Sequence, residues 1–250
     1  DFTFVYGFPG TTDEYLPATS LEQIQDVINP TRIGARTIAL EHIDKKMRED
    51  DATRIKYASN QARISNSHKK WIGEKLGLEK SNAVAKRQDY ENEFGKRIAK
   101  NAKSNAKYKN IIAELNQLNE QNQDYAVANT LFSEVFSANS ETLRMALSLI
   151  NMTNAFGTPQ FADTKSRTIR SLNNMYKDYD GEMDKIITEE LVDYYNDKMP
   201  KSLLPSKVYA KEEVVKALGN TLVNGTAKVN NLNVKTDLSK IAENYQQLVN

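Results

Sequence analysis

The stretch TRIGARTIALEHIDKKMRED, residues 31–50, decides the fold class because its apolar side chains recur at the spacing of one face of a helix. The side chains on that face are Ile33, Leu40, Ile43 and Met47. No proline lies between Pro30 and Pro159. Because proline breaks helices, this gap permits long uninterrupted ones. The sequence therefore predicts an all-α, multi-helix domain with long antiparallel helices.

Composition argues against several classes of protein. Lys and Arg number 34 against 33 Asp and Glu, so the chain lacks the global positive charge that most nucleic-acid binders carry. No run of about 18 apolar residues is present, and no membrane span is expected. The absence of cysteine excludes disulfides, thiolate metal sites and a cysteine nucleophile. The 250 residues suffice for one large domain or two small ones.

Helical patterns continue beyond residue 50. Residues 51–80 predict a helix with Asp51 as its N-cap and with Gly73 and Gly77 marking its end. Its expected packing face carries Ile55, Ala58, Ala62, Ser65, Lys69 and Ile72. Residues 81–124 predict either one helix of ~65 Å, at about 1.5 Å per residue, or two helices broken near residues 103–105. Further helices are expected at residues 125–136, 140–154, 162–177, 181–197, 211–220 and 237–248.

The first residues, DFTFVYGFPGTT, do not fit a helical protein. Residues 1–6 alternate and are rich in aromatic and β-branched side chains, which predicts a strand. The following Gly-Phe-Pro-Gly is typical of a tight turn. A lone strand leaves its backbone hydrogen-bonding groups without partners. The predicted strand therefore needs partner strands, and the helical patterns of the chain do not supply them.

The two histidines offer no hydrolase triad, which needs a base histidine oriented by a carboxylate beside a nucleophile. His42 lies on the charged side of its helix. His68 lies beside Lys69 and Lys70, whose charges lower its pKa without orienting the ring. Both are interpreted as surface histidines, and no G-x-S-x-G or H-E-x-x-H motif is present. No catalytic residue, cofactor or metal is predicted for this chain.

The stretch DYDGEMDKIITEE, residues 178–190, resembles a calcium loop only in part. In a loop that starts at Asp178, the sixth position needs a glycine for its sharp turn and holds Met183. The stretch is better interpreted as a turn in which Asp180 or Gly181 caps the following helix.

A basic stripe is the main binding surface that the residues alone suggest. Its members, at spacings of four, three and four, are Lys96, Lys100, Lys103 and Lys107. Such a stripe can bind phosphates or an acidic peptide, or it can be a solvated face or one paired with acids. No aromatic residues alternate with the lysines to stack on bases. Nucleic acid is therefore not predicted as a partner.

Asn66 lies in the middle of the helix predicted for residues 51–80. Asparagine forms helices poorly because it bonds backbone groups outside them. The small and basic residues on or near its face are Ser59, Ala62, Lys69, Lys70 and Gly73. Asn66 can present its amide to a ligand or can be an exposed asparagine in an asparagine-rich chain, and the residues alone leave both readings open.

Two motifs resemble the bacterial dipeptidyl-peptidases of serine peptidase family 46. The strand followed by GFPGTT and Tyr15 is similar to the family's M-G-F-P-G-x-T-x-x-Y/F, which ends a barrel strand before an inserted helical domain. Residues 57–73, YASNQARISNSHKKWIG, are similar to a tyrosine, small residues and then N-x-x-K-x-x-I-G. The matching positions are Tyr57, Ala62, Asn66, Lys69, Ile72 and Gly73. A weaker match covers residues 178–185 and 203–205.

The resemblance implies a division of the chain. Residues 1–12 would be the last strand and exit turn of a trypsin-like β-barrel, and residues 13–250 an α-helical cap domain. Enzymes of this family are periplasmic or cell-surface serine exopeptidases that release dipeptides from peptide N-termini, with their triad in the barrel. No segment here matches their catalytic His, Asp or Ser motifs, so the chain alone is expected to be inactive.

The resemblance also implies one substrate-binding residue. In the family, an asparagine of the helical domain helps bind the substrate's α-amino group, and Asn66 matches it in register. The implied partners are peptide substrates, the missing β-barrel domain and, in a homodimer, a second copy. The alternative is a stand-alone helical binding or adaptor protein that uses the basic stripe. That protein would pair residues 1–6 within its own fold or carry them as a dispensable arm.

Overall fold

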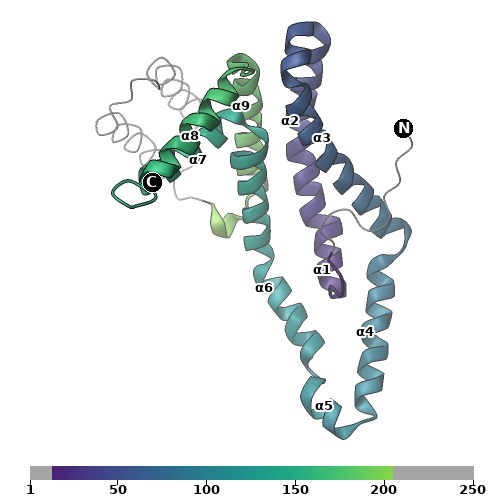
Figure 1. The fold of residues 1–250 in the computed structure, drawn as a ribbon. Coiled ribbons are helices and arrows are strands. Elements are labelled where there is room, and N and C mark those ends of the chain that lie inside the picture. Colours follow the sequence, from purple (N-terminus) through teal and green to yellow (C-terminus); the bar gives the residue numbers. More distant parts are fainter. Residues whose placement is uncertain (1–12, 205–250) are drawn as a thin grey trace, which may run out of the picture. The chain divides into compact units, whose positions relative to one another are not determined.

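The computed structural model describes residues 13–204 of the protein. Within this range the chain forms helices joined by short turns, and it contains no strand (Figure 1). The prediction of an all-α fold is confirmed for these residues. The predicted strand at residues 1–6 and the predicted helices at 211–220 and 237–248 lie outside them.

Nine α-helices, two π-helices and one 3₁₀ turn follow one another in the described range. The first half of that range contains α1 (Ala18–Gln23), the π-helix η1 (Ile24–Ile28), α2 (Asn29–Glu49), α3 (Asp51–Lys80), α4 (Ala83–Ala99) and α5 (Ala102–Tyr108). The second half contains α6 (Ile111–Phe132), the π-helix η2 (Ser133–Asn139), α7 (Glu141–Asn154), α8 (Phe161–Tyr176), α9 (Gly181–Lys198) and the 3₁₀ turn η3 (Lys201–Leu203).

The described chain divides into two compact units. The smaller contains residues 13–27 and 73–123, and the larger contains residues 28–72 and 124–204. Two long helices are shared between them, since α3 and α6 each begin in one unit and end in the other.

In the smaller unit, α1 binds both α4 and α6 through polar contacts. Pro17 precedes α1 and has no side-chain acceptor for the free N–H groups of the helix. The Glu91 carboxylate of α4 supplies one, accepting the Ala18 N–H at 2.8 Å. On the other side, the Thr19 hydroxyl donates to Asn116 Oδ1 of α6 at 2.9 Å. These contacts tie the start of α1 to two helices far along the chain.

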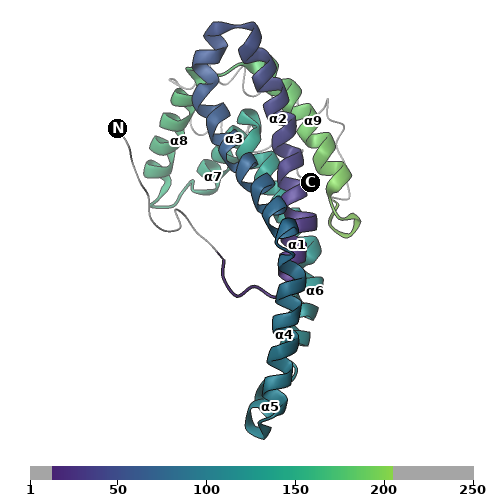
Figure 2. The same cartoon turned by 90° about the vertical axis from the view of Figure 1, so that its right-hand side faces the viewer.

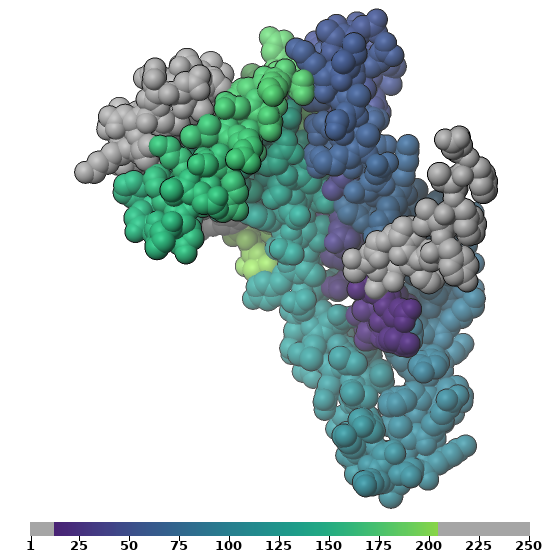
Figure 3. Space-filling model, in the orientation of Figure 1, coloured from purple at the N-terminus to yellow at the C-terminus, as the bar shows by residue number. Residues whose placement is uncertain are grey.

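In this unit, α5 joins the end of α4 to the start of α6, and the three helices form a hairpin (Figures 1 and 2). In the space-filling view, small gaps remain between α4 and α6 (Figure 3). Leu115 and Leu118 are 40% and 60% exposed on α6. Ala18 and Glu91 are the only buried residues among the described positions of the unit. The unit therefore depends more on polar contacts than on an apolar core.

The prediction of one helix or two over residues 81–124 is wrong, because breaks after α4 and α5 divide the segment into three. Asn101 starts α5 by accepting the Ser104 N–H on its side-chain oxygen at 3.0 Å. The new helix predicted to start at residue 125 is also wrong, since α6 runs without a break to Phe132.

Both predicted ends of α3 differ from the structure. The cap at its start is Asp50, whose carboxylate accepts the N–H groups of Ala52 and Thr53 at 3.2 and 2.9 Å. Asp51 is the first helical residue instead. The helix also runs through Gly73 and Gly77 to Lys80, because a glycine lowers helix stability by only about 1 kcal/mol and does not force an end.

The larger unit has an apolar core built from α2, α3, η2, α7, α8 and α9. Its most deeply buried members include Ile43, Ile64, Val135, Met152, Ile187 and Leu191. Gly34 lets α2 approach α9 closely, because a Cβ at this position would meet the Tyr194 ring. The Tyr194 hydroxyl donates to the Thr31 carbonyl at 3.1 Å across the same contact.

The helices predicted at residues 140–154, 162–177 and 181–197 are confirmed to within a residue or two, as are the breaks between them. Asp180 is the N-cap of α9 and accepts the Met183 N–H at 3.0 Å, as one of the two predicted caps. Residues 181–186, which a calcium loop starting at Asp178 would wrap around the ion, are helical.

Candidate functional site

Asn66 lies on the exposed face of α3. The buried residues of this helix are Thr53, Tyr57, Ile64 and Ser65, whereas Ile55 is 76% exposed. The packing face predicted from Ile55, Ala58 and Ala62 is therefore wrong and is turned toward solvent. The exposed neighbours of Asn66 within the larger unit are Ser59, Ala62, Lys69 and Lys70. Asn66 is itself exposed, and no hydrogen bond to its side chain forms within the described range.

A buried arginine fixes the turn of α3 that precedes Asn66. Arg36 of α2 donates from Nη1 to the Ile64 carbonyl oxygen at 3.2 Å. Its Nε donates to Glu134 Oε2 at 2.8 Å, and its guanidinium lies 4.5 Å from the centre of the Trp71 ring. Because Arg36 and Glu134 are 6% and 4% exposed, this contact lies within the core. Arg36 thereby holds α3 against α2 through the backbone before Asn66 and through the Trp71 ring after it.

The two histidines do not form a catalytic triad. The Thr37 hydroxyl donates its only proton to the Ile33 carbonyl at 2.9 Å, so at 3.0 Å from His68 Nε2 it acts as an acceptor. His68 therefore cannot serve as a base toward Thr37. Loss of solvent lowers the pKa of His68, and the charges of Arg36 and Lys69 lower it further, the direction predicted from the neighbouring lysines. His42 Nε2 lies 3.0 Å from Glu190 Oε1 of α9, so among the described residues the ring contacts a carboxylate but no nucleophile.

A network of buried hydroxyl and carboxyl groups joins α3, α7 and α9. The Tyr57 hydroxyl donates to Glu141 Oε2 at 2.7 Å and accepts the Asp180 N–H at 2.8 Å. The Asp184 carboxylate accepts the N–H groups of Glu141 and Thr142 at 2.9 and 2.8 Å, so a side chain from α9 caps the start of α7. Burial raises the pKa of both Glu141 and Asp184, and hydrogen bonds to each carboxyl partly offset the shift.

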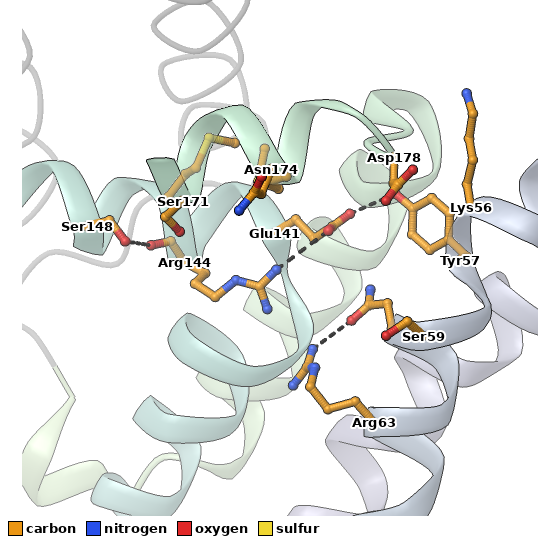
Figure 4. A pocket seen from close by; sticks show the side chains of 13 residues that line it. Lys56, Tyr57, Ser59, Arg63, Glu141, Arg144, Ser148, Ser171, Asn174 and Asp178 are labelled. Carbon is orange, nitrogen blue, oxygen red and sulfur yellow. Dashed lines mark hydrogen bonds and ion pairs between the residues drawn. The ribbon is translucent and has the colours of Figure 1, made fainter. Parts of the chain in front are cut away.

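A pocket of about 350 Å³ opens beside this network, between α3, α7 and α8 (Figure 4). Its lining residues are Lys56, Tyr57, Ser59, Asn60, Arg63, Glu141, Arg144, Met145, Ser148, Ser171, Asn174, Met175 and Asp178. All of them belong to the larger unit. Asn66 is not among them, although it lies one turn beyond Arg63 along α3.

Other candidate surfaces from the sequence are not assembled. The predicted basic stripe needs one continuous helix, and the break at Lys100–Asn101 separates Lys96 from Lys103 and Lys107. Lys96 pairs with Glu93 at 2.7 Å. Residues 13–204 hold no group of three or more His, Asp or Glu side chains that could bind a metal ion. None of the helices described has the length and apolar character that crossing a membrane requires.

Sequence reasoning missed the pocket. It placed Tyr57 in a motif, but it gave no role to Arg63, Glu141, Arg144 or Asn174. These residues come from three helices separated by long stretches of chain, and no local spacing joins them. The acid Glu141 after the N-cap Ser140 is a local signal, but it indicates the start of a helix and not a pocket.

Comparisons with known proteins give a family and a fold. The sequence model of the family described as Peptidase S46 matches residues 1–247. An Asp/Glu-specific dipeptidyl-peptidase of Capnocytophaga gingivalis is 37% identical over 250 residues, which cover 99% of this chain and 35% of that protein. Dipeptidyl-peptidase 7 of Porphyromonas gingivalis is 31% identical over 205 residues, covering 82% and 28%.

A solved structure is similar to the described fold. DPP11 of Porphyromonas endodontalis, in complex with the dipeptide Arg-Glu, superposes with a TM-score of 0.65 at 17% sequence identity. The match covers 97% of this chain and 38% of that one. The chain spans about a third of the length of the curated Asp/Glu-specific relatives that it matches.

Proposed function

Because the chain belongs to the peptidase S46 family, we propose that it is the helical cap domain of a dipeptidyl-peptidase that removes dipeptides from peptide N-termini. In this proposal the cap covers the cleft of a catalytic β-barrel and contributes Asn66 to the site for the substrate's α-amino group. The catalytic triad belongs to the barrel, outside this chain. The observation that carries the proposal is the family match over residues 1–247 by a chain that spans about a third of its relatives.

The surroundings of Asn66 support its assigned role. Its side chain is exposed and uses none of its hydrogen-bonding capacity within the described range. On its N-terminal side, Ser59 and Ala62 are small, and the Arg63 side chain is directed to Asn60 and Ala138, so another surface can approach the helix closely there. Arg36 holds the preceding turn through the Ile64 carbonyl. The amide is therefore presented from a rigid element, as a binding residue requires.

The chemistry fits a peptide ammonium group. An ammonium has three N–H donors and no acceptor, and an amide oxygen can accept one of them without adding a competing charge. A carboxylate at the same place would bind any cation more strongly, including lysine side chains. The neutral amide thus contributes a hydrogen bond to the free N-terminus of the peptide. Selection for its positive charge comes from other groups of the site.

Closing such a cap excludes water from the cleft and can limit turnover through its own motion. It also restricts the substrate to chain ends that thread into the cleft, which suits an exopeptidase. From the family alone, we further propose that the enzyme acts in the periplasm or at the cell surface.

The test measures dipeptide release by the full-length protein and its Asn66→Ala variant. Fluorogenic dipeptide substrates with an acidic or an apolar penultimate residue should both be used. Losing one hydrogen bond to a charged group costs ~1.5–3 kcal/mol, so kcat/KM should fall by about 10- to 150-fold. The loss should be much smaller with N-acetylated peptides, which lack the ammonium group.

Asn173→Ala is the matched control. Asn173 is an exposed asparagine within α8 of the same unit, and its side chain makes no hydrogen bond within the described range. Its replacement should leave kcat/KM unchanged. A loss of less than about twofold for Asn66→Ala would show that the assigned role is wrong.

A further inference from the structure

The pocket between α3, α7 and α8 is the strongest unassigned feature of the larger unit. Its volume of about 350 Å³ lies at the lower end of the range of small-molecule sites, roughly 300–1,000 Å³. Figure 4 shows the side chains of Arg63 and Arg144 reaching into the same space from α3 and α7. The Lys56 side chain lies at the edge and extends away from them.

Arg63 has no carboxylate partner within the described range. Its Nη2 donates to two neutral acceptors, Asn60 Oδ1 at 2.7 Å and the Ala138 carbonyl at 2.8 Å. Arg144 has one weak ion pair, with 3.5 Å between its Nη2 and Glu141 Oε1. The Glu141 carboxyl is already bonded to Tyr57 through its other oxygen. Neither guanidinium is therefore fully neutralised.

The electrostatic balance at Arg63 agrees with this geometry. The residue as a whole is exposed, but its guanidinium is partly shielded from solvent. This loss of solvent lowers the pKa of Arg63, and repulsion from Arg144 and Arg36 lowers it further, outweighing the attraction of Glu141 and Glu134. An anion placed between Arg63 and Arg144 would relieve the repulsion.

Neutral donors and an apolar wall complete the lining. Asn174 uses only its oxygen, to accept a bond from Lys177 at 3.4 Å, so its NH₂ group remains available to donate. The Ser171 hydroxyl makes no hydrogen bond within the described range and lies on the same helix. The side chains of Met145 and Met175 supply the apolar part. Two guanidinium groups with an amide and a hydroxyl match the acceptor pattern of a carboxylate.

We propose that this pocket binds a small organic carboxylate about the size of a dipeptide, held by Arg63 and Arg144 with help from Asn174 and Ser171. The acids Glu141 and Asp178 also line the pocket. They favour a single negative charge over the double charge of a phosphate, because repulsion grows with ligand charge. The methionine side chains would contact the aliphatic part of the ligand.

The test titrates the full-length protein by isothermal titration calorimetry with N-acetyl-Ala-Ala, which has a free carboxylate and no ammonium. Its C-terminal amide is the neutral twin, succinate is a carboxylate from a non-peptide source, and inorganic phosphate is the competing anion. We expect the acid to bind and the amide to bind at least about tenfold more weakly. Saturable binding of either carboxylate supports the proposal, and the stronger of the two identifies the source.

Variants then locate the site. Arg144→Gln and Asn174→Ala should each raise the Kd of the carboxylate, the former at least about tenfold. Arg167→Gln is the matched control, since Arg167 is an exposed arginine of α8 paired with Asp163 outside the pocket. Asn66→Ala should leave this Kd unchanged, which separates the pocket from the proposed amine site. Circular dichroism should show that each variant is folded.

Three results would overturn the proposal. The first is equal binding of the acid and its amide. The second is an Arg144→Gln Kd within about twofold of the unmodified protein while Asn174→Ala is also unchanged. The third is binding of phosphate with no binding of either carboxylate at millimolar concentration.

Discussion

Replacing Arg36 by methionine removes the charge that neutralises Glu134 within the core of the larger unit. Both residues are almost fully buried, at 6% and 4% exposure. Arg36 Nε lies 2.8 Å from Glu134 Oε2, and Nη2 lies 3.4 Å from Oε1. Methionine keeps much of the side-chain length but none of the donors. The variant therefore leaves a buried carboxylate without its cation.

Breaking a buried ion pair from one side typically costs about 3–5 kcal/mol. Loss of the cation–π contact with Trp71 adds ~0.5–1 kcal/mol. We expect Arg36→Met to lower the free energy of unfolding by about 3–6 kcal/mol, and Glu134→Leu to lower it by about 3–5 kcal/mol. The double variant removes both charges, so its free energy of unfolding should fall by far less than the sum of the losses in the two single variants. Asn139 would still donate to the backbone oxygen of residue 134, as it does now at 2.9 Å.

Urea unfolding followed by circular dichroism measures these quantities. Fluorescence of Trp71, the single tryptophan of the chain, reports on the same contact. The double-mutant cycle should give a coupling free energy of at least about 2 kcal/mol. Additivity within about 0.5 kcal/mol would refute the reasoning, because it would mean that Arg36 does not neutralise Glu134.

Three further predictions concern other contacts of the fold. Asp184→Ala leaves two buried N–H groups at the start of α7 without an acceptor. The free energy of unfolding measured in urea should fall by about 2–5 kcal/mol. The control Asp163→Ala, at an exposed position, should lower it by less than about 0.5 kcal/mol. Burial raises the folded-state pKa of Glu141, so the folded state binds its proton more tightly than the unfolded state. Stability from this group should grow as pH falls from neutral toward the ordinary carboxyl range and be lost as pH rises through the folded-state pKa. Glu141→Gln should flatten that part of the stability–pH curve, and an unchanged slope would contradict the assignment. Gly34→Ala should lower the thermal unfolding midpoint because its methyl group meets Tyr194, and Tyr194→Leu in the same chain should restore part of the loss.

Local pattern was sufficient to predict most helices of the larger unit. The stretch that becomes α2 carries Leu40 and Ile43 at helical spacing, and both are buried. The helix start at Asp180 was likewise readable from an N-cap residue next to a glycine.

The ends of helices and the packing face of α3 were harder to predict from the sequence. Gly73 and Gly77 looked like a C-terminus, but both remain within α3. A break was expected near residues 103–105, whereas Asn101 caps α5 and the break lies just before it. Ile55 was assigned to the packing face and is 76% exposed. Which face of α3 packs depends on Arg36 and Tyr57 finding partners in distant helices, and those partners leave no mark on the local sequence.

The two candidate sites differ in whether they could be predicted from the sequence. Asn66 came from a resemblance, and the structure places it on an exposed face of α3. The carboxylate pocket could not have been predicted, because Arg63 and Arg144 are brought together only by the packing of α3 against α7. Arginine is common on solvated helix faces, and neither residue stands out by its neighbours.

In two helices of the chain, an N–H group at the helix start is bonded to a carboxylate that is synthesised much later. The start of α1 relies on Glu91, which follows Ala18 by 73 positions. The start of α7 relies on Asp184, which follows Glu141 by 43 positions. During synthesis, each of these helix starts emerges before the group that completes it and remains exposed to solvent until the later helix docks. Such a chain is expected to acquire its final structure by docking of helices after both members of a pair have been made, rather than by adding finished helices in order from the N-terminus.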